Sequence, residues 1–253
     1  MSQLELIEHY YDEAPRANAD AHEVGPFTLF VAREGWPYYA RPRVGEQDFT
    51  VDDVTRVVRE QRARRLPQSL EWVHEVTPAL LAPATAAGLR VAHCPLLVLD
   101  ATLDAGDGLV VDILTAEDPR LGRVFAAIEA GFSETDRVRA EPVREWVGPR
   151  IRRRLLSVAG AFNASGDAVG GGSHAVRDGV SELTGIAVLP QYRRRGIGAA
   201  ITKVLADDAA AAGATTVFLS AGTDDVARVY ERVGFRRVGT ACIAAAPSRQ
   251  QAT

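Results

Sequence analysis

Cysteine, lysine and long apolar runs are all scarce in this sequence. The 253 residues include only two cysteines, Cys94 and Cys242, which is too few for the disulfide framework of a small secreted domain. No apolar stretch approaches the roughly 18 residues that a membrane-spanning helix needs. The first residues are acidic and lack the basic and then apolar pattern of an export signal. We therefore expect a cytoplasmic protein with reduced, buried thiols.

Signals for a metal ion or a polyanionic partner are also missing. The five histidines show no ligand spacing, and a net charge of −4 offers no general attraction to nucleic acid or to an anionic membrane. Only Lys203 among the 29 basic residues is a lysine, and we assign this bias no function. The sequence predicts no metal, no nucleic acid and no membrane among the partners.

What is present suits a globular chain of one large or two small domains. Apolar residues make up 47% and charged residues 25% of the chain, close to the averages for soluble globular proteins. At about 150 residues per domain the length allows either arrangement. It is also sufficient to bury a full core without disulfides or metals.

Strand and helix patterns alternate through the second half of the chain. Leu109–Leu114 is typical of a strand, and an acidic helix start near Glu117 leads into a helix that ends by Gly131. The further expected elements are a helix at Pro142–Leu156, strands at 155–163, 168–176 and 181–189, a helix at Ala199–Ala212, a strand at 215–222, a helix at 224–235 and a last strand at 235–244. Antiparallel strands followed by strand–helix–strand–helix–strand predict a mixed α/β fold.

The first hundred residues repeat this order in outline. Asp53–Val91, moved forward by 146 positions, lies without a gap on Ala199–Arg237 and brings helix onto helix and strand onto strand. Identities are few, so two unrelated stretches with similar loop lengths could align as well. We predict a degenerate copy at 1–100, a complete domain at 109–246, and a turn-rich linker, Leu99–Gly108, between them.

The sharpest chemical signal is a basic, glycine-containing segment at a predicted helix start, formed by Arg193, Arg194, Arg195, Gly196, Ile197 and Gly198. A helix N-terminus is an anion site because its N–H groups are unpaired and its dipole is positive. Gly196 and Gly198 let the backbone approach the anion, and the arginines add charge. The segment lacks the third glycine of a dinucleotide-binding motif and the Gly-Lys-Ser/Thr of a P-loop. A pyrophosphate suits it, and a basic helix start without a ligand is the alternative.

The wider context of this segment resembles a known family. A strand that ends at Val188, the pattern Arg193-x-x-Gly196-x-Gly198, and a later helix with Tyr230 and Gly234-Phe235 follow one another. Together they resemble the GNAT superfamily, the acyl-CoA-dependent N-acetyltransferases. The resemblance implies a GNAT-like acetyltransferase fold with a mixed sheet, in tandem with a degenerate GNAT-like N-terminal half.

The resemblance implies where the co-substrate binds. Backbone N–H groups of the loop from Arg193 to Gly198 would hold the pyrophosphate of acetyl-CoA or another short acyl-CoA. The main chain of Ile186, Ala187 and Val188 would pair with the pantetheine arm, and a divergence of this strand from the next would admit the acyl group. An ordinary core strand is the alternative for these three residues.

The resemblance also assigns residues to the transfer of the acyl group. Glu182 matches the general base of the histone-type members, and His174 on the preceding strand is the reserve base. The Val188 N–H would stabilise the developing oxyanion, and Tyr230 matches the tyrosine that protonates the leaving thiolate. A solvent-facing strand residue is the alternative for Glu182, and a packed aromatic residue is the alternative for Tyr230.

One position departs from the family pattern. Where an asparagine often contacts the cofactor arm, this chain has Asp224, which can cap a helix but cannot donate a hydrogen bond as a carboxylate. In the N-terminal copy, the equivalents of Arg193, Gly196, Gly198 and Tyr230 are Gln47, Thr50, Asp52 and Ala84. We therefore expect that copy to bind no cofactor and to wall the acceptor site instead.

Two further groups of residues could serve the acceptor. Trp36, Tyr38, Tyr39 and Trp72 could line its site, although large aromatics are more often core residues. The basic run Arg150–Arg154 could meet an acidic acceptor or the 3′-phosphate of the co-substrate, although a solvated helix face is the simpler explanation.

These features predict an N-acetyltransferase that moves an acetyl or short acyl group from CoA to a primary amine by direct attack. A non-catalytic acyl-CoA-binding or regulatory module is the alternative. The acceptor, a small molecule or a peptide, and the acyl-chain preference cannot be read from the sequence. Assembly into a homodimer is left open as well.

Overall fold

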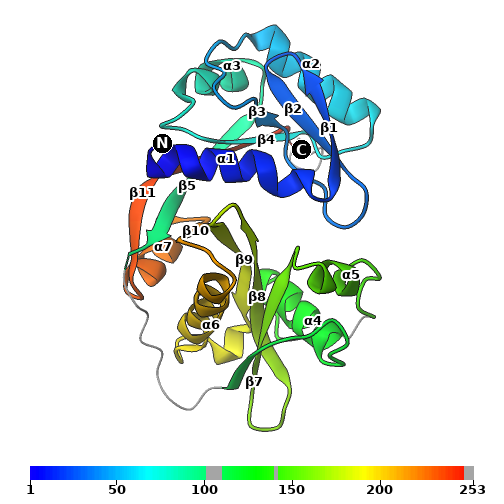
Figure 1. Ribbon diagram of the computed structural model, residues 1–253, viewed down its shortest axis with the longest axis vertical. Coiled ribbons are helices and arrows are strands. Elements are labelled where there is room, and N and C mark those ends of the chain that lie inside the picture. The colour runs from blue at the N-terminus through cyan, green and yellow to red at the C-terminus, as the bar shows by residue number, and fades with distance from the viewer. Residues whose placement is uncertain (101–109, 140–141, 248–253) are drawn as a thin grey trace. The chain divides into compact units, whose positions relative to one another are not determined.

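The computed structural model describes residues 1–100, 110–139 and 142–247. The chain divides into two compact units (Figure 1). The first unit contains residues 1–97, 220–228 and the segment from 237 onward, and the second contains residues 98–219 and 229–236. The end of the chain thus returns to the unit in which the chain begins.

The first unit is built from two sheets and three helices. Its elements are α1 (Gln3–Arg16), β1 (Ala19–Val24), β2 (Phe27–Ala32), β3 (Arg41–Pro42), α2 (Val51–Ala63), β4 (Ser69–Val73), a 3-10 turn at Pro78–Leu80, α3 (Leu81–Ala86), and most of β5 (Arg90–Leu99) and β11 (Phe235–Ala245). The first three strands form an antiparallel sheet in the order β1-β2-β3, and β11 lies between β4 and β5. The last strand, β11, therefore pairs with β4 of the first unit, although it follows the second unit in sequence.

The core of the first unit forms where α2 and α3 meet β4 and β11. Trp72 is fully buried there beside Val54, Leu70 and Cys242. The prediction that Trp72 could line an acceptor site is therefore wrong, because its ring is part of this core. Cys94 and Cys242 are free and buried, as expected.

The second unit is a mixed sheet flanked by helices, which confirms the predicted α/β class. Its elements are β6 (Val110–Ile113), α4 (Leu121–Phe132), α5 (Val147–Arg152), β7 (Ser157–Phe162), β8 (Ala168–Arg177), β9 (Val180–Val188), a 3-10 turn at Pro190–Tyr192, α6 (Ile197–Ala211), β10 (Thr216–Ser220) and part of α7 (Asp224–Glu231). The strand order is β10-β9-β8-β7-β6, with β9 and β10 parallel and the other neighbours antiparallel.

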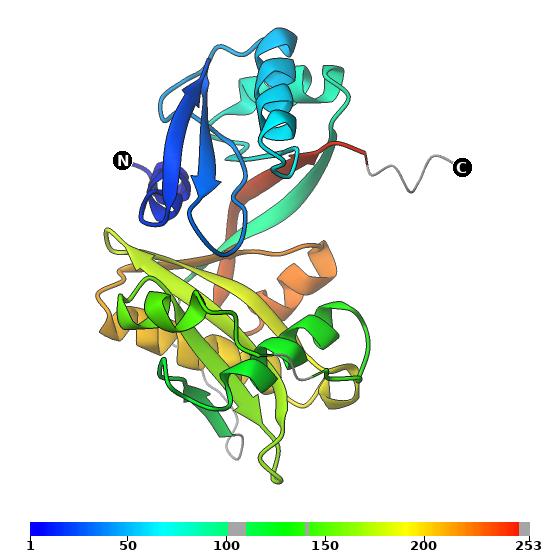
Figure 2. The same cartoon turned by 90° about the vertical axis from the view of Figure 1, so that its right-hand side faces the viewer.

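Helices α4 and α6 cover opposite faces of β8 and β9 (Figures 1 and 2). Glycines in β8 allow both helices to lie close to the sheet. A Cβ on Gly171 would come within 2.6 Å of Val124 in α4, and one on Gly172 would come within 3.0 Å of Leu205 in α6. The run of three glycines in β8 is thus a packing requirement on both faces of the sheet.

One predicted helix is much shorter than expected. The sequence predicts a helix over Pro142–Leu156, whereas α5 has six residues, Val147–Arg152. Arg154 takes a left-handed conformation (φ 55°), and the Leu155 N–H donates to the Arg150 carbonyl. This hydrogen-bonded helix end closes α5 before Leu155, one of the apolar residues that prompted the longer prediction.

The helix–strand–helix–strand order of residues 53–91 occurs again at residues 199–237, as the 146-residue shift predicts. That shift places α2 on 197–209, inside α6, and places the start of β5 one residue after the start of β11. Strand β4 falls on 215–219, one residue ahead of β10. The starts of these three aligned pairs of elements therefore agree to within one residue, although few residues are identical.

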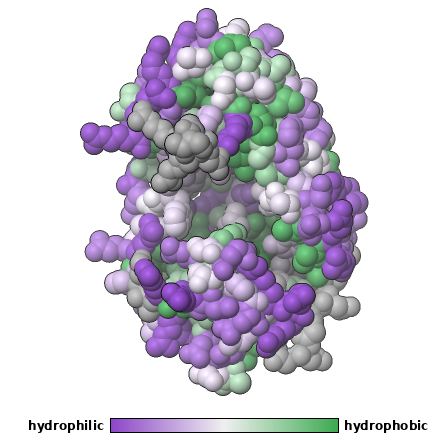
Figure 3. Space-filling model, turned by 180° about the vertical axis from the view of Figure 1, so that it is seen from behind, coloured by the Kyte–Doolittle hydropathy of each residue, from purple (hydrophilic) through white to green (hydrophobic). Residues whose placement is uncertain are grey.

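Apolar side chains are mostly packed inside the units. Hydrophilic residues cover most of the face shown in Figure 3, and hydrophobic ones are mixed among them. In the part of the chain that the structure describes, no helix is long and apolar enough to cross a membrane. The same residues include no group of three or more histidine, cysteine or acidic side chains placed to hold a metal ion.

Candidate active site

The segment between β9 and α6 is fixed by one arginine. The Arg193 guanidinium donates to the Val188 carbonyl (3.0 Å), the Gly131 carbonyl (2.7 Å) and the Glu134 carboxylate (2.7 Å). It therefore ties the end of β9 to the C-terminal end of α4. Because these contacts use the Nε and both terminal nitrogens, the Arg193 side chain positions the loop.

The start of α6 is open to a ligand. Gly196 is the N-cap residue, with φ 78°, and no side chain accepts a hydrogen bond from the first turn. A Cβ built on Gly196 or Gly198 would have no atom within 4 Å. Arg194 also has a positive φ of 60°, so two residues of the loop, Arg194 and Gly196, take a left-handed conformation. Backbones of this kind turn successive N–H groups toward one point, where an anion can bind.

Arg194 and Arg195 lie on the exposed surface of this loop. The Arg195 guanidinium lies 5.5 Å from the centre of the Tyr192 ring, and the Tyr192 hydroxyl accepts a hydrogen bond from Asn163 (3.2 Å). Ile197 is buried below the loop and anchors it to the core. The loop thus combines a fixed backbone with two exposed positive charges beside an uncapped helix start.

Strands β9 and β10 separate beside this loop. The parallel ladder that the structure describes runs from Thr216↔Val180 to Phe218↔Glu182, while β9 continues to Val188 and β10 to Ser220. This is the divergence that the family resemblance implies. It leaves the last two thirds of β9, from Leu183 to Val188, without a β10 partner on that side.

The hydrogen-bond pattern shows which way the Val188 main chain points. The Leu189 N–H donates to the Val169 carbonyl (2.9 Å), and the next cross-strand pair is Gly170↔Val188. In an antiparallel ladder such pairs alternate, so the N–H and C=O of Val188 point away from β8. The Val188 N–H therefore points toward the side on which β10 has diverged, while the Val188 carbonyl already accepts a hydrogen bond from the Arg193 guanidinium.

A β-bulge reshapes β9 just before this point. The register with β8 shifts between Gly171 and Ser173, so that Gly185 and Ile186 together oppose Gly172. Gly185 has φ 63°, which a glycine adopts without strain. Bulges turn a strand's later residues to a new direction, and here those residues are Ile186 and Ala187, one half-buried and one buried.

Glu182 lies on the partly exposed face of β9, where the ladder with β10 ends. The reserve base, His174, is 2% exposed. Its Nε2 lies 2.8 Å from the Asp208 carboxylate and its Nδ1 lies 3.1 Å from the Ser181 hydroxyl. Burial also lowers the pKa of His174. Both ring nitrogens are therefore used inside the core, between the sheet and α6.

Tyr230 belongs to the second unit and packs in a T-shape on Phe235, with ring centres 5.9 Å apart. Burial raises the pKa of Tyr230 to about 12, so its hydroxyl keeps its proton at neutral pH.

Asp224 belongs to the first unit, where its carboxylate accepts a hydrogen bond from Arg237 (2.6 Å). The Thr223 hydroxyl, and not Asp224, accepts the hydrogen bond from the Val226 N–H at the start of α7.

A family comparison agrees with this geometry. Residues 124–235 match the model of the acetyltransferase (GNAT) family. This segment is a GNAT acetyltransferase domain. It includes β9, the loop from Arg193 to Gly198, α6 and Tyr230. No curated protein sequence matches the chain.

Solved structures extend the likeness beyond the GNAT domain. A GCN5-related N-acetyltransferase from Kribbella flavida is 20% identical and superposes with a TM-score of 0.74 over 100% of this chain and 98% of its own. A conserved protein of unknown function from Staphylococcus epidermidis is 15% identical (TM-score 0.60, 93% and 96%). A tandem GNAT protein from the clavulanic acid biosynthesis pathway is also 15% identical (TM-score 0.53, 89% and 80%). At these identities the likeness is one of fold.

The first unit differs from the GNAT domain where the anion would bind. Helix α2, the counterpart of α6, begins with a capping box in which the Thr50 hydroxyl accepts from the Asp53 N–H and the Asp53 carboxylate accepts from the Thr50 N–H. Asp52 adds a second negative charge to this turn. The N-terminal end of α2 is thus closed and acidic, and it repels an anion.

The sequence gives no sign of the residues at the end of α4 that hold the segment between β9 and α6 in place. Besides Glu134 and Gly131, the Asp136 carboxylate accepts from the Gln191 N–H (3.0 Å). A Cβ on Gly131 would lie 3.1 Å from the Val188 carbonyl oxygen, so only glycine fits there without a shift. These residues precede the loop by more than 50 positions, and no local pattern marks them.

Proposed function

We propose that this protein is an N-acetyltransferase that moves an acetyl or short acyl group from acyl-CoA to a primary amine by direct attack. The proposal rests on one observation, which is that two features lie next to each other in the chain of the GNAT domain. The uncapped start of α6 at Gly196 follows directly from β9, the strand that loses its β10 partner beyond Glu182. An anion site and a strand edge with free pairing positions are what a CoA thioester requires.

Several residues would hold the co-substrate. The N–H groups of Gly196, Ile197 and Gly198 would bind the pyrophosphate, and Arg194 and Arg195 would add charge beside it. The main chain of Ile186 to Val188 would pair with the pantetheine arm. The absence of any atom near a Cβ on Gly196 or Gly198 supports this fit.

When bound, acyl-CoA supplies an activated carbonyl group. Glu182 would accept the proton of the attacking amine, directly or through water. The Val188 N–H, which points away from β8, would stabilise negative charge on the carbonyl oxygen. The Tyr230 hydroxyl, protonated at neutral pH, would give its proton to the leaving thiolate. We favour Glu182 over His174 because both nitrogens of His174 are already bonded.

Residues 1–100 would be a degenerate GNAT-like module beside a catalytic domain at 109–246. The repeated element order supports this, and the capping box at Thr50 supports the loss of its anion site. The chain would then bind one acyl-CoA. The acceptor would be a small-molecule or peptide amine. Free, buried thiols at Cys94 and Cys242 are consistent with a reducing, cytoplasmic setting.

Isothermal titration calorimetry with acetyl-CoA tests the proposal, with NADH and ATP as control ligands. We expect one site per chain, no comparable heat from the control ligands, and loss of binding in Gly196→Trp. Gly166→Trp is the matched control, because Gly166 also has a positive φ (81°) and no atom within 4 Å of a built Cβ, yet lies in the β7–β8 turn. Equal binding by both variants, or no binding by the wild-type chain, would reject the co-substrate site.

A screen of amine acceptors, read by release of CoA thiol, then separates an enzyme from the alternative, a non-catalytic acyl-CoA-binding module. An enzyme gives thiol release that depends on the amine and falls in Glu182→Gln and Tyr230→Phe. A binding module gives acetyl-CoA heats without amine-dependent release, and the two substitutions then change nothing. The second result would keep the site but overturn the transferase.

A further inference from the structure

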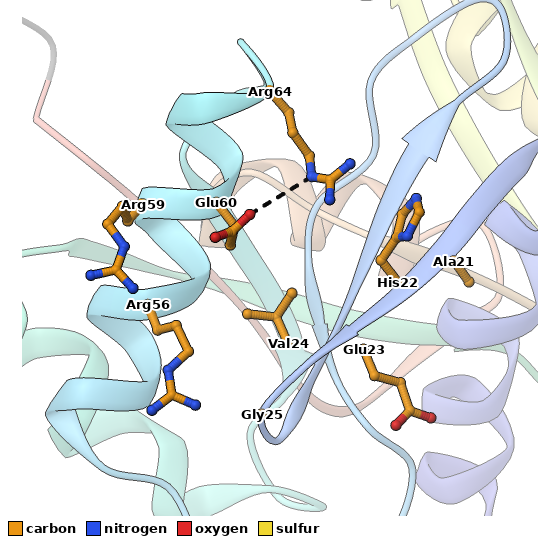
Figure 4. Close-up of a pocket in the computed structure, with 9 residues that line it drawn as sticks. All are labelled: Ala21, His22, Glu23, Val24, Gly25, Arg56, Arg59, Glu60 and Arg64. Atoms are coloured by element: carbon orange, nitrogen blue, oxygen red, sulfur yellow. Dashed lines mark ion pairs between the residues drawn. The ribbon is translucent and has the colours of Figure 1, made fainter.

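A groove in the first unit lies between β1 and α2 and is rich in arginine (Figure 4). It encloses about 610 Å³. One wall is formed by the consecutive residues 21–24 of β1 and by Gly25, and the other comes from one face of α2. No part of the proposed acyl transfer uses this groove.

The β1 wall is the edge of a sheet. Strand β1 pairs with β2 along its whole length, from Ala19↔Ala32 to Val24↔Phe27, and it is the end strand of the order β1-β2-β3. In an antiparallel pair every second residue turns its N–H and C=O away from the partner. The outer edge of β1 therefore presents backbone donors and acceptors to which another extended chain can pair.

The α2 wall is positively charged. Arg56, Arg59 and Arg64 line the groove, and among the described residues no ion pair or hydrogen bond engages Arg56 or Arg59. Arg64 approaches Glu60 only at 3.9 Å. The remaining acidic lining residue, Glu23, is already paired with Arg43 (2.8 Å). Within the residues that the structure describes, Arg56 and Arg59 are thus the two guanidinium groups of the groove that have no carboxylate partner, whereas Arg64 lies beside Glu60.

The spacing of these arginines matches a strand better than a single anion. Arg56 and Arg64 are eight residues apart, which is about 12 Å along a helix. Side chains on one face of an extended chain repeat about every 7 Å, so two repeats span a similar length. A single phosphate would contact one or two of these arginines. Acidic side chains at alternate positions of a strand could contact all three of Arg56, Arg59 and Arg64.

We propose that this groove binds an extended acidic segment of a partner protein. The segment would add to the free edge of β1 by main-chain hydrogen bonds, and its carboxylates would face Arg56, Arg59 and Arg64. The backbone pairing would supply the general affinity, and the arginines would select acidic sequences. The first unit, which has lost its own anion site at Thr50, would thereby gain a role in recruiting a partner.

Fluorescence anisotropy of the full chain tests this, with a labelled peptide in which valine alternates with aspartate and glutamate. We expect binding that weakens with added salt and falls by about tenfold or more in the double variant Arg56→Glu/Arg59→Glu. Arg62→Glu is the matched control, because Arg62 lies on the same helix but donates to Gln68 and does not line the groove. Unchanged melting temperatures in both variants establish that the fold is intact.

A second peptide, N-methylated at alternate residues, keeps the charges but removes the main-chain donors of one edge. Weaker binding of this peptide supports strand addition, and equal binding overturns it in favour of charge attraction alone. The proposal is also overturned if Arg62→Glu weakens binding as much as the double variant. It fails too if inorganic pyrophosphate binds at these arginines while the peptide does not, or if sedimentation shows that a second copy of the chain occupies the groove.

Discussion

Arg193 and Glu134 form an ion pair of 2.7 Å between the loop before α6 and the residues that follow α4. The same guanidinium also donates to the Gly131 and Val188 carbonyls. All three nitrogens of the Arg193 guanidinium group are thus engaged in contacts that hold the fold together. In the proposed anion site, this side chain would fix the backbone whose N–H groups bind the pyrophosphate.

Replacing Arg193 by alanine should weaken acetyl-CoA binding by about tenfold, because the loop loses all three contacts. Glu134→Gln should change the affinity much less, because the Glu134 side chain is 70% exposed and such pairs contribute little. Calorimetric dissociation constants give both values. The control is Glu117→Gln, which removes a pair of equal length, with Arg152, away from the loop. Equal effects of Arg193→Ala and Glu117→Gln would contradict the positioning role.

Replacing Tyr230 by phenylalanine should lower kcat by about a hundredfold and leave KM for acetyl-CoA nearly unchanged. The ring contact with Phe235 remains in the variant, so the melting temperature should not change. Because burial raises the pKa of Tyr230 to about 12, the wild-type rate should show no loss from tyrosine ionisation up to about pH 10. Steady-state kinetics across pH, with Tyr192→Phe as control, check this. A variant with wild-type kcat would remove Tyr230 from the mechanism.

Glu182→Gln and His174→Gln should separate a base from a structural histidine. A glutamine at 182 cannot accept the amine proton, so kcat should fall while the melting temperature stays close to that of the wild type. His174→Gln should instead lower the melting temperature, because it leaves the buried Ser181 hydroxyl and the partly exposed Asp208 carboxylate poorly matched. Steady-state kinetics and thermal unfolding of both variants distinguish the base from the structural residue. If kcat falls only in His174→Gln, His174 and not Glu182 is the base.

Glu8 should make the stability of the first unit depend on pH. It is 7% exposed, and its carboxylate accepts a hydrogen bond from the Val73 N–H (2.8 Å) beside the Arg41–Glu71 ion pair. Burial raises the pKa of Glu8 to about 7 from an ordinary 4.5. The folded state therefore holds this proton more tightly, and the resulting stability is complete below about pH 4.5 and is lost as the pH rises through 7.

Glu8→Gln isolates this effect, because the amide oxygen can still accept from Val73 but cannot ionise. Between pH 5 and pH 8 the wild-type free energy of unfolding should fall by about 3 kcal/mol relative to the variant. Urea unfolding of both chains at several pH values measures the difference, in which the contributions of Asp12, Glu71 and the other groups common to both chains cancel. Parallel curves for the two chains would show that Glu8 does not titrate in this range.

The sequence by itself determined the features that depend on neighbouring residues. The order of strands and helices over 53–91 and 109–246, the glycine motif at the start of α6 and the loss of its counterpart at Thr50 were predictable, because periodicity and capping act over a few positions. The GNAT assignment followed from the same local signals.

Tertiary structure alone decided what joins distant positions. It placed β11 beside β4, buried Trp72 in a core, engaged both nitrogens of His174 and gave Arg193 the partners Gly131 and Glu134. The physical reason is that these choices are set by packing and by satisfaction of buried polar groups between elements far apart in the chain. A local pattern shows that a residue can serve in a strand or a site, and the fold determines which neighbour it meets.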